Sequence, residues 1–98
     1  MDESRTRTQV QDHADAVVRG DMEQVTADFA AELRPQVPQI AQTLPLPVTS
    51  AEVVKLDVGD EESVAEIRYS GERGQVTIRT RWRDVDGRPT IVAGEPIG

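Results

Sequence analysis

The chain has 98 residues, which is enough for one domain and too few for two. Eighteen acidic and eleven basic residues give a net charge of −7 and a pI near 4.6. This balance argues against general nucleic-acid binding, which needs a basic surface. The chain has no cysteine and one histidine. Disulfides, thiolate metal sites and thiol nucleophiles are therefore excluded, and we expect neither a bound metal nor a cofactor.

The sequence contains no run of about 18 apolar residues, and it begins with the polar stretch MDESRTRTQV. We therefore expect no membrane span, no signal peptide and a cytoplasmic location. Residues 1–5 are expected to form a disordered tail, and residues 6–98 a single domain.

The first half of the chain has the spacing of helices. From about residue 6 the apolar positions fall on one helical face, at Val10, Ala14, Val17 and Val18. Gly20 is placed to end this helix in a left-handed conformation. Asp21 then begins a second helix, with Gln24 completing a capping box. Its expected buried side is Met22, Val25 and Phe29.

A third helical stretch follows, with a stripe of Leu33, Val37, Ile40, Ala41 and Leu44. Two prolines interrupt it. Pro35 suits a first helical turn, whereas Pro38 requires that the helix start close to it or kink there.

The second half of the chain predicts four strands near residues 50–58, 63–70, 75–85 and 88–97. The strongest turn signal is Asp86-Gly87, a favoured two-residue hairpin loop. Pairing the strands through their turns sets Val54 and Ile78 opposite Ile67, and Trp82 opposite Ile91. One apolar set then lies on a common face: Val54, Leu56, Val58, Ala65, Ile67, Tyr69, Val76, Ile78, Trp82, Ile91 and Ala93. The other face carries Lys55, Glu66, Arg68, Arg79, Arg81 and Arg83. The sequence thus predicts an α+β fold, with three N-terminal helices on one face of a four-stranded antiparallel meander.

This layout resembles the NTF2-like (SnoaL-like, cystatin-type) superfamily. The resemblance rests on residues 16–23, AVVRGDME, and residues 80–88, TRWRDVDGR. It implies a fold shared by steroid isomerases, dehydratases, polyketide cyclases and members that only bind ligands or partners. The hairpin that usually separates the second and third helices is missing here, and Pro89 replaces a common aromatic residue. We expect a smaller or more open pocket as a result.

His13 is the first candidate for chemistry. Its position on the stripe of the first helix directs it toward the sheet, where an imidazole can act as a general base. The alternative is a buried histidine that is satisfied by one hydrogen bond. Asp12 and Asp15 flank it, but residues one and two apart on a helix do not face each other.

Glu95 is the second candidate, because the hairpin register directs it into the apolar face opposite Ile78. A carboxylate there would have a raised pKa. The alternative is a bulge at Gly94 that turns Glu95 outward. Glu52, at the edge of the same face, is a weaker candidate of the same kind.

The three large aromatic side chains, Phe29, Tyr69 and Trp82, either line a ligand pocket with His13 or fill the core. The outer face of the sheet, with Arg79, Arg81, Arg83, Glu66 and Val92, is either solvated or a homodimer interface, with Val53 and Val64 between its charges. No metal-ligand spacing or phosphate-binding glycine loop is present.

Three functions follow as hypotheses. The first is an NTF2-like module without catalytic residues that dimerises through the outer sheet face and binds a small apolar ligand. The second is a small isomerase, dehydratase or cyclase with His13 as base, helped by Tyr69 or Glu95. The third is a domain that binds a protein partner and whose pocket is filled by its own side chains.

Overall fold

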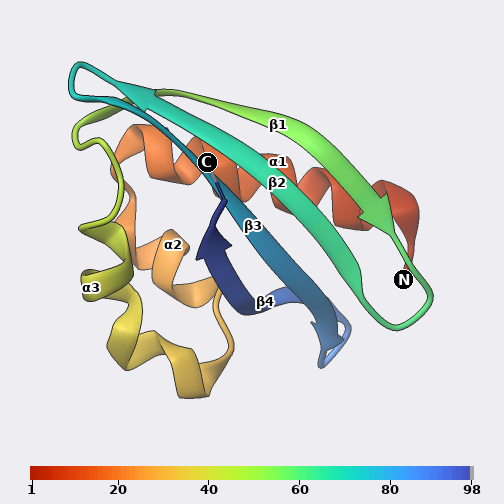
Figure 1. The fold of residues 1–98 in the computed structure, drawn as a ribbon. Coiled ribbons are helices and arrows are strands. Elements are labelled where there is room, and N and C mark those ends of the chain that lie inside the picture. The colour runs from red at the N-terminus through yellow and green to blue at the C-terminus, as the bar shows by residue number, and fades with distance from the viewer. Residues whose placement is uncertain (98) are drawn as a thin grey trace.

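A computed structural model describes residues 1–97 and has the α+β architecture of three helices followed by a four-stranded antiparallel sheet (Figure 1). The helical segments are α1 (Glu3–Arg19), α2 (Met22–Ala27), the 3₁₀ helix η1 (Ala31–Gln36) and α3 (Val37–Ala41). The strands are β1 (Val48–Val58), β2 (Ser63–Gly71), β3 (Gly74–Val85) and β4 (Arg88–Pro96).

Helix α1 begins at Glu3, so residues 3–5, which were expected to lie in a tail, are helical. The side chain of Asp2 accepts a hydrogen bond from the backbone N–H of Arg5 at 2.8 Å, which caps the first turn. At the other end Gly20 is left-handed, with φ 73°, and its N–H bonds to carbonyls of the last turn. The predicted end of this helix is confirmed.

The short helices between α1 and the sheet begin where the capping residue and the prolines predict. Asp21 caps α2 by accepting from the N–H of Gln24 at 3.2 Å. Pro35 lies in η1, and Pro38 lies in the first turn of α3, where its missing N–H costs no helical bond. Met22 is 43% exposed, so its predicted place on the buried side of α2 is wrong.

The sheet has the order β1-β2-β3-β4, and its strands match the predicted ranges within two residues. The β2–β3 register is as predicted throughout, including Ile67 opposite Ile78. The register next to the Asp86-Gly87 turn is also confirmed, with Trp82 opposite Ile91.

Bulges change the register of both outer strands. In β1 the extra residue is Val54, so Val53 pairs with Ile67 and packs against the core while Val54 is 41% exposed. In β4 the register shifts between Ile91 and Ala93, which places Gly94 opposite Thr80. The predicted inward positions of Val54 and Ala93 are therefore wrong, because one extra residue turns the side chains beyond it, counted from the hairpin turn, to the other face.

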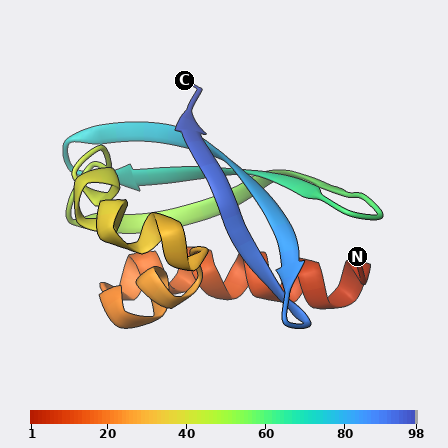
Figure 2. The same ribbon diagram turned by 90° about the horizontal axis from the view of Figure 1, so that it is seen from below.

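All the helices pack on one side of the twisted sheet, with α1 running beneath it and α2, η1 and α3 grouped at one end (Figure 2). The largest fully buried apolar side chains lie between these layers and are Val10, Val37, Ile67, Trp82 and Ile91. No helix within residues 1–97 has the length and apolar character needed to cross a membrane.

Candidate functional site

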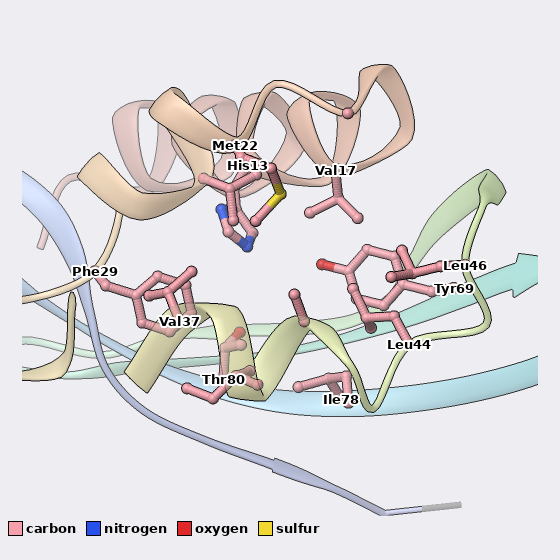
Figure 3. Close-up of a pocket in the computed structure, with 14 residues that line it drawn as sticks. His13, Val17, Met22, Phe29, Val37, Leu44, Leu46, Tyr69, Ile78 and Thr80 are labelled. Atoms are coloured by element: carbon pink, nitrogen blue, oxygen red, sulfur yellow. The ribbon is translucent and has the colours of Figure 1, made fainter. Parts of the chain in front are cut away.

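A cavity of about 110 Å³ lies between the helices and the sheet (Figure 3). Its wall is almost entirely apolar, and the polar side chains that reach it are those of His13, Tyr69 and Thr80. The apolar lining comes from every helical segment but η1 and from the loop after α3: Val17, Met22, Val25, Phe29, Val37, Ile40, Ala41, Leu44 and Leu46, with Ile78 from the sheet.

The cavity opens to the surface past three apolar side chains. Met22, Ile40 and Leu46 line it and are 43%, 36% and 46% exposed, respectively. They come from α2, α3 and the loop before β1. No hairpin separates α2 from α3 within the described residues, so short helical segments and the loop before β1 form this side of the cavity.

His13 projects from α1 toward the cavity and is 3% exposed. Its Nδ1 lies 2.8 Å from Oδ2 of Asp28, which directly follows α2 and is fully buried. The edges of Phe29 and Trp82 pack against the imidazole, at centroid distances of 6.0 and 5.6 Å. The ring is therefore held in one orientation from three sides.

Asp28 is held in place by both backbone and side-chain contacts. Ile91 of β4 donates its N–H to the carbonyl of Asp28 at 2.8 Å, and Phe29 bridges to the same strand. The carboxylate accepts from Gln9 at 3.0 Å and from Arg88 at 2.5 Å, in addition to His13. Burying a carboxylate is costly unless donors surround it, and here three side chains supply them.

This arrangement sets the tautomer of the neutral imidazole. A carboxylate only accepts hydrogen bonds, so the single N–H of the ring is at Nδ1 and points to Asp28. Nε2 then carries a lone pair on the side of the ring that faces the cavity (Figure 3). Within residues 1–97, no protein group forms a hydrogen bond with Nε2.

Tyr69 extends from β2 into the same space, and its hydroxyl points toward His13 (Figure 3). Burial raises the pKa of Tyr69 well above its usual value, and the negative charge of Asp28 adds to the effect. The phenol therefore stays protonated and acts as a hydrogen-bond donor. Its hydroxyl has no protein partner in the part of the chain described here.

The hydroxyl of Thr80 already makes two hydrogen bonds within the protein. It donates to the carbonyl of Ala65 at 3.0 Å and accepts from Nε1 of Trp82 at 2.8 Å. Trp82 is fully buried beside His13 but does not line the cavity. Of the four predicted ligand-binding residues, the structure brings His13, Phe29 and Tyr69 to the cavity and places Trp82 behind His13.

The two carboxylates that sequence reasoning considered lie away from the cavity. The shifted register of β4 places Glu95 opposite Arg79, and their charged groups are 3.6 Å apart on the outer face. The outward alternative for Glu95 therefore describes the structure, with the bulge at Val92 and not at Gly94. Glu52 is exposed and pairs with Arg68 at 2.6 Å.

The outer face of the sheet carries the expected charges, paired with one another. Arg79 contacts Glu66 at 3.3 Å, and Glu62 accepts from Arg81 at 2.7 Å and from Arg83 at 3.2 Å. Val53, which was predicted to lie between these charges, packs inward instead. Val92 remains partly exposed.

Sequence reasoning missed Asp28, together with Gln9 and Arg88. Two local signals were available. Gln9 and His13 are four residues apart and so project from the same side of α1. Asp28 is also the one acidic residue in the stretch 25–31, VTADFAA.

Comparison with known proteins does not place the chain in a family. No protein-family model matches it, and no curated protein matches its sequence significantly.

Proposed function

We propose that this chain binds a small, mainly apolar molecule between its helices and its sheet, and removes a proton from it with His13 as general base. The observation that carries the proposal is the 2.8 Å contact between Nδ1 of His13 and buried Asp28, with Nε2 on the cavity side. The contact with Asp28 occupies Nδ1 and leaves Nε2 available to a molecule in the cavity.

The residues suggest a division of roles. Nε2 of His13 accepts a proton from a carbon or hydroxyl of the ligand, and Asp28 stabilises the imidazolium that forms. The hydroxyl of Tyr69 donates to the ligand oxygen on which negative charge develops. When His13 returns the proton to a different carbon, the net reaction is an isomerisation. Isomerases, dehydratases and cyclases are the enzyme classes that the NTF2-like resemblance implies.

The size of the cavity limits the ligand. An engineered apolar cavity of about 150 Å³ binds benzene, and the cavity here measures about 110 Å³ and is open at its mouth. A six-membered ring with one carbonyl group fits this chemistry. A β,γ-unsaturated cyclohexenone is a suitable probe, because base-catalysed movement of its double bond gives the conjugated isomer.

The test is the rate of that isomerisation, followed by ultraviolet absorbance. We expect the wild-type protein to accelerate it, and His13→Gln to reduce kcat/KM by about 100-fold or more. Tyr69→Phe should reduce kcat by about 100-fold, because one donor to the developing oxyanion is lost. Glu95→Gln, on the outer face, is the matched control and should keep wild-type activity. A wild-type protein that binds the ketone by NMR without converting it would overturn the catalytic proposal.

Binding without chemistry is the second candidate function, and the apolar lining of the cavity favours it. In this case the chain would be a module that holds an apolar ligand, and the expected homodimer through Arg79, Arg81, Arg83, Glu66 and Val92 belongs to the same proposal. A native mass spectrum of the freshly purified protein tests for the dimer and for a bound ligand. A dimer with extra non-protein mass supports the module, and a bare monomer at high concentration contradicts the dimer.

A further inference from the structure

Arg88 connects the surface of the molecule to the buried Asp28. It is the first residue of β4, directly after the Asp86-Gly87 turn, whose two residues have φ of 53° and 79°. One guanidinium nitrogen is 2.5 Å from Oδ1 of Asp28, and another donates to the carbonyl of Ala27 at 2.9 Å. The Arg88 side chain is 44% exposed, whereas that of Asp28 is fully buried.

The hairpin that carries Arg88 is itself tied to α1. The guanidinium of Arg5 donates to the carbonyl of Gly87, so the tip of the turn is anchored beside the helix that carries His13. Because β4 also bonds to the backbone of residues 28 and 30 through Ile91, the position of Arg88 relative to Asp28 is determined from two directions.

We infer that Arg88 is a positioning residue, which holds the Asp28 carboxylate toward His13 and compensates its charge so that the imidazole remains an unprotonated base. The inference rests on the proposed function of His13. A buried carboxylate beside an imidazole favours the imidazolium, and a cation on the same carboxylate opposes this. Without Arg88, more of the imidazole would be protonated at a given pH and unable to accept a proton from the ligand.

The other groups around this pair do not replace Arg88. Gln9 on α1 is neutral, and Tyr69 on β2 stays protonated because burial raises its pKa. Arg34, from η1, donates to the carbonyls of Phe29 and Ala27 and makes no salt bridge to Asp28. Among residues 1–97, the Asp28 carboxylate therefore has one permanently charged partner.

The test uses the fact that His13 is the only histidine in the chain, so its ring gives one set of NMR signals. The pH titration of this ring is compared in the wild type, Arg88→Met and Arg88→Gln. We expect the midpoint in both variants to move to higher pH, since the positive charge paired with the carboxylate that contacts the ring is lost. Arg88→Lys keeps the positive charge, so its titration midpoint should stay close to that of the wild type.

Arg83→Met is the matched control, because it removes the same charge from the outer face of the sheet, where Arg83 pairs with Glu62. Its titration should coincide with that of the wild type. If Arg88→Met and Arg88→Gln also coincide with the wild type, the inference is wrong. The titration needs no substrate, so this outcome is distinct from a failure of the catalytic proposal.

The pH dependence of the cyclohexenone isomerisation gives a second readout. In Arg88→Gln the acid limb of the kcat/KM profile should move in the same direction as the NMR titration, with the rate recovered at higher pH. A rate loss that is equal at every pH would indicate a structural defect alone and would contradict the positioning role.

Discussion

Carboxylates paired with arginine lie on both sides of the sheet, but their surroundings differ. On the outer face Glu62 pairs with Arg81 and Arg83, whose side chains are 53% and 55% exposed. On the inner side Asp28 is fully buried and contacts His13, Gln9 and Arg88. Water screens the outer pairs, so they contribute little to stability, whereas the inner carboxylate depends entirely on its protein donors.

The difference determines how firmly each carboxylate is held. A surface ion pair adjusts to the loss of a partner by becoming hydrated, so its geometry is loosely held. A buried carboxylate cannot do this, and its surroundings fix the direction of the imidazole. The inner cluster therefore holds the ring of His13 in a defined orientation.

Removing Asp28 should have the largest effect. We expect Asp28→Ala to lower the free energy of unfolding by about 3 kcal/mol, because a buried donor cluster loses its acceptor. Urea denaturation measures the change. Asp15→Ala removes an exposed carboxylate from α1 and should change stability far less. Equal losses of unfolding free energy in the two variants would contradict the difference between the buried and the exposed carboxylate.

Thr6 is the opposite case to Asp28, because its buried polar group has no hydrogen-bond partner. Thr6 on α1 is fully buried, and its hydroxyl is the one side-chain polar atom within residues 1–97 that is completely inaccessible, to solvent and to the cavity alike, and lacks a hydrogen bond. We expect Thr6→Val, which keeps the shape, to stabilise the protein by about 1 kcal/mol. Thr8→Val, at an exposed position on the same helix, is the control. A destabilised Thr6→Val in thermal denaturation would mean that the hydroxyl has a partner after all.

The outer face should show the smallest effect, present at neutral pH and lost at acid pH. The hydrogen bond from Arg81 lowers the pKa of Glu62 below its ordinary value of 4.5, against a lesser opposing effect of burial, and Arg83 lowers it further. Because the folded-state pKa is depressed, the stabilisation is present above the unfolded-state pKa and is lost as pH falls through the folded-state value. The difference in stability between wild type and Glu62→Gln should therefore be larger at pH 7 than at acid pH. A difference that grows toward acid pH would reverse the sign and contradict this account.

The local features of the fold were predictable from the sequence. Gly20 ends α1, Asp21 caps α2, and the Asp86-Gly87 turn sets Trp82 opposite Ile91. Each of these depends on interactions between residues that are close in the chain or joined by a tight turn. The direction of His13 toward the sheet is of the same kind, because helical spacing determines it.

Only the tertiary structure decided the bulges and the surroundings of His13. An extra residue at Val54 or Val92 depends on how the sheet curves over the helices, and it determines whether Val53 packs inward and Glu95 points outward. Asp28 lies 15 residues from His13 in the chain and 60 from Arg88. These residues meet because the backbone of β4 holds the end of α2, a contact over long sequence distance that no local pattern encodes.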